Sequence, residues 1–210
     1  MFNLDPVTIA LRIPVLLIAI TVHEFAHARV AYAYGDATAK YHGRMNLNPI
    51  NHLDPIGTLM ILLAGFGWAK PVPINPYNFH NYRAGLRWVS LAGPLSNFAL
   101  GFVSLFGLRF LLAFAAGPEL LIDFFWVLVE LNILLGVFNL IPIPPLDGSK
   151  ILVSLAPDSF LNFYQQIEQY APLILLMLIV TGALGVIITP AFYLIFTTFN
   201  AIIRLIPGLS

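Results

Sequence analysis

Long apolar segments constrain the fold of this chain more than any other feature of its sequence. A transmembrane helix needs about 20 largely apolar residues to cross a bilayer. Four segments reach or exceed that length, namely residues 7–34, 86–116, 120–141 and 171–206. Hydrophobic residues make up 59% of the chain and charged residues only 10%, so little polar surface remains for a water-soluble domain. The sequence therefore predicts an all-α polytopic membrane protein with four to five transmembrane helices.

The last apolar segment, residues 171–206, leaves the number of helices open. It contains Gly182, Gly185 and Pro190, and Pro cannot continue a helix without losing a backbone hydrogen bond. We therefore expect two short helices with a turn near Pro190, in place of one long tilted helix. The chain is expected to form one membrane-embedded domain, 1–210, with its core at 7–150 and a C-terminal helical hairpin at 171–206.

The connection between the first two spans, residues 35–83, is rich in Asn, Pro and Gly but includes an apolar stretch at 56–68. As a helix this stretch would extend only about 20 Å, which is too short to cross. We expect a re-entrant hairpin buried against protein, because unpaired backbone is not tolerated in lipid. Residues 43–47 and 70–74 flank it and are predicted to pair as short β-strands. Such a strand edge could hold an unwound substrate beside the site described below.

Overall charge and cysteine content exclude several classes of function. Ten basic and ten acidic side chains give a net charge of zero, so nothing indicates nucleic-acid binding. The chain contains no Cys, which excludes thiolate metal sites, cysteine nucleophiles and disulfides and leaves His, Asp and Glu as candidate metal ligands.

Basic residues indicate how the spans are oriented. They gather in the connection between the first two spans and are absent from the one around Gly117. Because cytoplasmic loops carry an excess of Lys and Arg, the first connection is predicted to be cytoplasmic in a multi-pass protein of the cell membrane. The basic residues concerned are Lys40, Arg44, Lys70, Arg83 and Arg87.

The strongest chemical signal is the pattern His-Glu-x-x-His at residues 23–27, inside the first span. Residues four apart lie on one face of a helix, so His23 and His27 can reach the same metal ion. Glu24 can then reach a water molecule on that metal. Two packed core histidines would be the structural alternative, but ionisable groups at membrane depth are costly and indicate function.

A catalytic zinc takes three protein ligands and a water molecule, so two His leave the site one ligand short. Asp147 has the most suggestive setting, because it follows Pro142, Pro144 and Pro145, which end a helix and can turn the chain back into a protein-lined cavity. Asp147 could instead cap a helix that starts near Ser149. The other candidates for the third ligand are His42, His52, Asp54, His80 and Asp36.

Together, residues 23–27 in one span and Leu146-Asp147-Gly148 after a later one resemble the site-2 proteases, a family of intramembrane zinc metalloproteases. The resemblance covers nearly the whole chain and fits the compact bacterial and archaeal branch without a PDZ or CBS domain. Further segments that carry it are Asn48-Pro49, residues 52–55, residues 68–73 and residues 93–97.

The resemblance implies a role for each site residue. His23, His27 and Asp147 would bind one zinc ion, and Glu24 would be the catalytic carboxylate. Asn139, eight residues before Asp147, would hold the substrate carbonyl or its oxyanion. The implied activity is zinc-dependent cleavage of transmembrane segments or signal-peptide remnants in the lipid bilayer. The orientation predicted from the basic residues would open the active site to the cytoplasm.

A membrane metal-ion transporter is the alternative function. It predicts ligands repeated on several spans and internal symmetry, whereas the sequence has one His-Glu-x-x-His and no repeat. Among weaker features, residues 93–97 are expected to serve close helix packing. Glu130 and Arg109 are expected to make structural ion pairs, without a part in catalysis.

Overall fold

The computed structural model describes residues 6–54, 57, 69–115 and 117–209. Within these residues four helices are long and apolar enough to cross a membrane, which agrees with the predicted all-α polytopic fold. They are α1 (Pro6–Ala33), α4 (Tyr82–Phe110, continued by the π-helical turn η3, Leu111–Ala115), α5 (Glu119–Asn139) and α9 (Ala183–Ile203). Shorter helices are α2 (Thr38–Tyr41), η1 (Pro49–His52), η2 (Pro76–Asn78), α6 (Asp147–Leu155), α7 (Asp158–Glu168) and α8 (Ala171–Val180).

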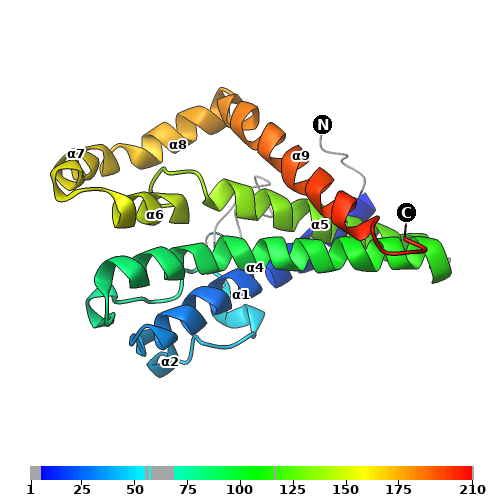
Figure 1. The fold of residues 1–210 in the computed structure, drawn as a ribbon, viewed down its shortest axis with the longest axis horizontal. Coiled ribbons are helices and arrows are strands. Elements are labelled where there is room, and N and C mark those ends of the chain that lie inside the picture. Colours follow the sequence, from blue (N-terminus) through cyan, green and yellow to red (C-terminus); the bar gives the residue numbers. More distant parts are fainter. Residues whose placement is uncertain (1–5, 55–56, 58–68, 116, 210) are drawn as a thin grey trace.

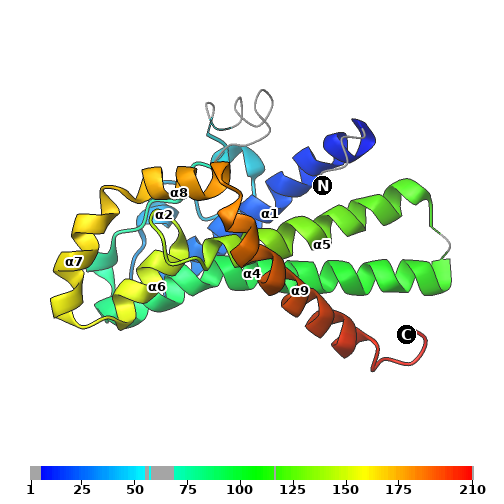
Figure 2. The same cartoon turned by 90° about the horizontal axis from the view of Figure 1, so that it is seen from above.

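The centre of the molecule is a bundle of α1, α4 and α5, each of which packs against the other two. Figures 1 and 2 show α4 and α5 running alongside one another, with α9 crossing them. The largest apolar core cluster lies where these three helices meet. Its buried members include Leu105 of α4, Ile133 of α5 and Ile203 of α9. This arrangement leaves one face of α1 turned toward α4 and α5, and that face carries the site.

The connection between α1 and α4 differs from the sequence prediction. Residues 43–47 form a turn and bends, and residues 70–74 form no regular secondary structure, so the two predicted strands do not form. Pro71 and Pro73 have no N–H group to donate to a ladder, which explains the absence of pairing. One isolated antiparallel bridge, Leu53 to Ala69, is the β-type pairing within the described residues. The predicted re-entrant stretch, 56–68, lies outside the described residues apart from Gly57.

The C-terminal segment forms two helices as predicted, but the break is not at Pro190. It falls between α8 and α9, where Gly182 adopts a left-handed conformation with φ of 73°. Gly accepts this conformation without a steric penalty and ends helices for that reason. Pro190 lies inside α9, where it removes one backbone hydrogen bond without ending the helix. With ten residues, α8 is too short to cross a bilayer.

Candidate metal centre

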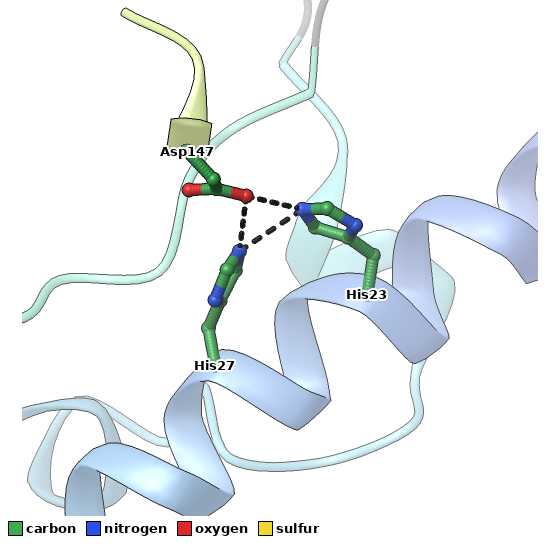
Figure 3. A group of neighbouring side chains, drawn as sticks. All are labelled: His23, His27 and Asp147. Atoms are coloured by element: carbon green, nitrogen blue, oxygen red, sulfur yellow. Dashed lines mark hydrogen bonds and ion pairs between the residues drawn. The ribbon is translucent and has the colours of Figure 1, made fainter. Parts of the chain in front are cut away.

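Three potential metal ligands from two distant segments meet where α1 faces the start of α6 (Figure 3). His23 and His27 are one turn apart on α1, and Asp147 is the first residue of α6. Asp147 Oδ2 lies 3.1 Å from His23 Nε2 and 3.0 Å from His27 Nε2, and the two Nε2 atoms are 2.9 Å apart. All three side chains are buried. The structure thus brings together the three residues that the sequence singled out.

A sharp turn after α5 carries Asp147 to this position. Helix α5 ends at Asn139, and the proline-containing segment 140–146 turns the chain back before α6 begins. A Cβ atom on Gly148 would lie 2.2 Å from the carbonyl oxygen of Leu140, so only glycine permits this close approach. The Asp147 carboxylate points at the imidazoles, and no side chain caps the N-terminus of α6. The alternative reading of Asp147 as a helix cap is therefore wrong.

The outer nitrogens of both imidazoles are held by hydrogen bonds. His27 Nδ1 lies 2.7 Å from the backbone carbonyl oxygen of Val89, and His23 Nδ1 lies 2.6 Å from Oδ1 of Asn97. Both partners are acceptors, so each Nδ1 carries a proton, and in the neutral ring each Nε2 then offers its lone pair to a metal. Two lone pairs and a carboxylate oxygen therefore converge with no protein donor between them. This donor set fits a zinc ion, which binds neutral imidazole and carboxylate and keeps a further position for water.

Glu24 and the metal ligands open onto a common cavity of about 270 Å³. Glu24 Oε2 accepts a hydrogen bond of 2.7 Å from the backbone N–H of Val72, in a segment without regular secondary structure. Asn139 also lines the cavity, with its Nδ2 donating to the carbonyl oxygen of Leu135 at 3.0 Å. Lys150 reaches the cavity from α6 and lies 3.4 Å from Oδ1 of Asp147. All five residues expected in the site are thus gathered around one space.

Helix α4 comes very close to the imidazoles at Gly93. A Cβ atom at this position would lie 2.5 Å from Nε2 of His23 and 2.5 Å from Nε2 of His27. Close packing was expected for residues 93–97, but this contact is made with the candidate ligands themselves. The hydrogen bond from His23 to Asn97, one turn further along α4, was not foreseen. An Asn inside an apolar span is the signal that could have found it.

The remaining candidates for the third ligand lie elsewhere. His52 Nε2 lies 2.9 Å from the carbonyl oxygen of Asn46, and Asp54 accepts from the backbone of Gly57. Among the described residues, His23, His27 and Asp147 form the one group of three with metal-ligand geometry, and neither His42 nor His80 joins it.

Asp36 has a structural role just beyond the C-terminal end of α1. Its buried carboxylate accepts hydrogen bonds from Thr38, from the backbone N–H of Asn75 and from the side chain of Asn78. Burial alone would raise the pKa of Asp36, but these hydrogen bonds outweigh it and hold the pKa below its usual value. Asp36 thereby ties the segment that lines the cavity to the end of α1.

Charged residues inside the spans are paired away from the site. Glu130 of α5 lies 3.6 Å from Arg12 of α1, which confirms the expected ion pair. Arg109 instead donates to the amide oxygen of Asn200 in α9 at 2.8 Å. Within the described part of the chain, Arg109 therefore bonds to a neutral amide where an ion pair was expected.

Comparisons with known proteins agree with this geometry. The family model of "Peptidase family M50" matches residues 113–181, which include Asn139 and Asp147. The protein named "Putative zinc metalloprotease YwhC" from Bacillus subtilis is 45% identical over 174 residues, which are 79% of this chain and 78% of that protein.

Two more distant relatives carry similar names. "Putative zinc metalloprotease Rip2" from Mycolicibacterium smegmatis is 31% identical over 178 residues, which are 80% of this chain and 66% of that protein. "Putative zinc metalloprotease MJ0611" from Methanocaldococcus jannaschii is 31% identical over 136 residues, which are 62% of each chain. No solved structure matches this chain.

Proposed function

Because the chain belongs to peptidase family M50, the site-2 protease family of zinc metalloendopeptidases, we propose that it cleaves transmembrane segments or signal-peptide remnants within the bilayer. One observation carries this proposal. His23, Glu24 and His27 lie inside the apolar part of α1, Ala10–Ala33, which is one of four spans found among the described residues, and Asp147 meets them there. A peptidase whose site lies on a membrane helix can reach a peptide bond in a membrane segment.

The proposed metal ligands are His23, His27 and Asp147. When bound, zinc supplies a Lewis acid that polarises the substrate carbonyl and makes a water molecule acidic enough to attack near neutral pH. The ligands' own task is geometric. The hydrogen bonds at His23 Nδ1 and His27 Nδ1 hold both rings with Nε2 facing the same point.

Glu24 is the proposed general base and acid. Its Oε2 accepts from the Val72 N–H, so the other carboxylate oxygen can take a proton from the attacking water and pass it to the leaving amine. The hydrogen bond from Val72 fixes the direction of the carboxylate. It also links the position of Glu24 to the segment around Val72, which lines the cavity.

Asn139 is proposed to hold the substrate carbonyl oxygen as negative charge develops on it. Its Nδ2 donates to the Leu135 carbonyl within its own helix. Reaching the substrate therefore requires a side-chain rotation that exchanges this hydrogen bond for one to the substrate. The place of Asn139 on the cavity wall makes that exchange possible.

The substrate is proposed to bind as an extended segment. A transmembrane helix hides its carbonyl groups in its own hydrogen bonds, so the cleaved part must unwind first. Pro71, Val72 and Ile74 line the cavity in a segment without regular secondary structure, and the unwound substrate is proposed to lie alongside it. Helix-breaking Gly, Pro or Asn near the scissile bond should then raise the rate of cleavage.

The cavity is proposed to open to the cytoplasm. Basic residues gather in the connection that lines it, and cytoplasmic segments favour Lys and Arg. His27 lies six residues before the end of α1 at Ala33, so the metal would sit about 9 Å from that end of the helix. Because the chain has no Cys, the single variants Lys150→Cys and Glu119→Cys test this. An impermeant thiol reagent should label them from the cytoplasmic and the outer face, respectively, and the reverse pattern would overturn the orientation.

Cleavage of defined membrane proteins tests the proposed function. The purified chain is reconstituted in vesicles with a panel of single-span proteins, with and without a zinc chelator, and the products are mapped by mass spectrometry. We expect cuts inside the apolar span that disappear with chelator and with Glu24→Gln. Cuts confined to soluble loops, or cuts that persist with Glu24→Gln, would overturn the proposal.

A further inference from the structure

A chain of buried amides links the metal centre to helix α5. His23 Nδ1 lies 2.6 Å from Oδ1 of Asn97, and Nδ2 of Asn97 donates to Oδ1 of Asn132 at 2.9 Å. Nδ2 of Asn132 in turn donates to the carbonyl oxygen of Leu128 at 2.8 Å. The side chains of Asn97 and Asn132 are both fully buried. The relay thus runs from α1 through α4 to α5 without contact with solvent.

Each amide in this relay can point in only one direction. Asn132 must turn its NH₂ group toward the Leu128 carbonyl, which leaves Oδ1 facing Asn97. Nδ2 of Asn97 donates to Asn132 and also to the carbonyl oxygen of Ala19 at 3.1 Å. Rotating the Asn97 amide by half a turn would set its oxygen against two other acceptors, Oδ1 of Asn132 and the carbonyl oxygen of Ala19. Oδ1 of Asn97 therefore faces His23, and only a protonated Nδ1 can bond to it.

We propose that Asn97 and Asn132 are positioning residues that fix the tautomer in which His23 can bind the metal. With the proton on Nδ1, the Nε2 lone pair faces His27 and Asp147. The opposite tautomer would place a proton on Nε2 and remove the ligand. This inference rests on the proposed function, because it assigns a role toward the metal of that site.

The two imidazoles are controlled in different ways. His27 donates to a backbone carbonyl, that of Val89, which any sequence with this fold would supply. His23 instead bonds to the side chain of Asn97, which is itself held by the side chain of Asn132 in α5. Of the two Nδ1 hydrogen bonds, only that of His23 can therefore be removed by replacing its partner's side chain.

A purely structural role for the two Asn residues makes a different prediction. Buried Asn side chains also join membrane helices by interhelical hydrogen bonds. Such a role would lower the stability of the metal-free protein and leave the tautomer of His23 unchanged. The tautomer and the zinc affinity at a temperature where the protein is folded therefore separate the two roles.

The first measurement needs no substitution. The zinc-free protein is labelled with ¹⁵N at histidine, and the nitrogen shifts and long-range couplings of His23 are recorded, with His23→Gln used to assign the signals. We expect the proton on Nδ1 of His23. The spectra are recorded at a pH at which the ring is neutral, and a single proton on Nε2 of His23 would overturn the proposal.

The second measurement is zinc affinity by competition with a chelator. Asn97→Leu removes the acceptor at similar size and should weaken binding roughly 10- to 100-fold, the usual effect of losing a partner that orients a ligand. Asn132→Leu frees the Asn97 amide to rotate and should weaken binding by less. Asn97→Asp keeps the acceptor toward His23, and its buried carboxyl, when protonated, can still donate to Asn132 or Ala19. It should therefore retain more affinity than Asn97→Leu, and it also serves if the Leu variant fails to fold.

Ser104→Ala is the matched control, because Ser104 is buried on α4 and donates only within its own helix, to the Leu100 carbonyl. Its zinc affinity should equal that of the unaltered protein. If the unaltered protein binds no zinc, the proposed function fails. If it binds zinc and Asn97→Leu binds equally well, or Asn97→Asp binds no better than Asn97→Leu, only the present inference fails.

Discussion

The α1–α4–α5 bundle and helix α9 differ in how their polar side chains bond, although Asn200 of α9 does accept from Arg109 of α4. In the bundle, buried polar groups bond between helices, as His23 does to Asn97 and Asn97 to Asn132. In α9, the hydroxyls of Thr197 and Thr198 bond to carbonyls of their own helix. Burial differs as well, since 39% of the α5 span is buried inside the protein and only 11% of the α9 span.

This difference separates the bundle, which carries the candidate site, from α9, which anchors the chain. An interhelical polar contact is specific to one register of two helices, whereas a hydroxyl bonded to its own helix tolerates any neighbour, including lipid. α9 meets the bundle mainly through apolar contacts, such as the rings of Phe199 and Phe102 with centroids 5.2 Å apart. Matched substitutions in the two regions should therefore have very different consequences.

The largest contrast is expected in activity. Glu24→Gln should lower kcat/KM by about 10²- to 10⁴-fold, because the amide cannot accept a proton from the attacking water. Zinc content should stay unchanged, since Glu24 is not among the proposed ligands. The matched change in α9 is Thr197→Val, which should leave both quantities unaltered. Comparable activity of Glu24→Gln and Thr197→Val would break the comparison.

The second contrast concerns two glycines in helices. Gly93→Ala places a Cβ 2.5 Å from both ligand nitrogens, so the rings must move and zinc affinity should fall roughly 10- to 100-fold. A Cβ on Gly185 in α9 meets no atom within 4 Å. Gly185→Ala should retain zinc affinity and stabilise the helix by up to about 1 kcal/mol. Chelator competition and unfolding in mixed micelles measure the two effects, and equal zinc affinities would contradict this account of Gly93.

The third contrast concerns two isoleucines. Ile133 of α5 is fully buried in the apolar core, whereas Ile187 of α9 is 49% exposed. Ile133→Ala should destabilise the fold by about 2 kcal/mol or more through the cavity that it leaves. Ile187→Ala should cost well under about 1 kcal/mol, because lipid can fill the space. Reversible unfolding of both variants tests this, and a larger loss at Ile187 would show that α9 is packed more tightly than its exposure indicates.

The smallest expected effect is a dependence of stability on pH at Asp36. Its folded pKa lies below its unfolded value, so its contribution to stability is present above the unfolded pKa and is lost as pH falls through the folded one. The difference in unfolding free energy between the unaltered chain and Asp36→Asn should therefore be constant near neutral pH and shrink below about pH 4. A difference that grows on acidification would contradict this. α9 has no acidic or basic side chain, so it should add nothing to this dependence.

The sequence predicted those parts of the molecule that depend on spacing along the chain. Apolar length predicted the spans, and the four-residue spacing of His23 and His27 predicted one shared face. Asp147 was the favoured third ligand because prolines precede it, and the structure brings it to both imidazoles. In each case the prediction depended on residues that are close together in the sequence.

Contacts between distant helices could not be read from the sequence. Several Asn residues occur in this chain, and only the packing of α1, α4 and α5 selects Asn97 and Asn132 as partners of His23 and of each other. Arg109 likewise finds Asn200 through the crossing of α4 and α9. The turn predicted at Pro190 was wrong for a local reason, since Gly182 provides a better helix end nearby.

The metal content of the purified protein tests the proposed centre most directly. Elemental analysis should find about one zinc per chain in the unaltered protein. The variants His23→Ala, His27→Ala and Asp147→Ala should each retain almost none, because every one removes a ligand from a three-ligand site. Full zinc retention by Asp147→Ala would contradict the account, since it would mean that the residue delivered by the turn after α5 is not part of the site.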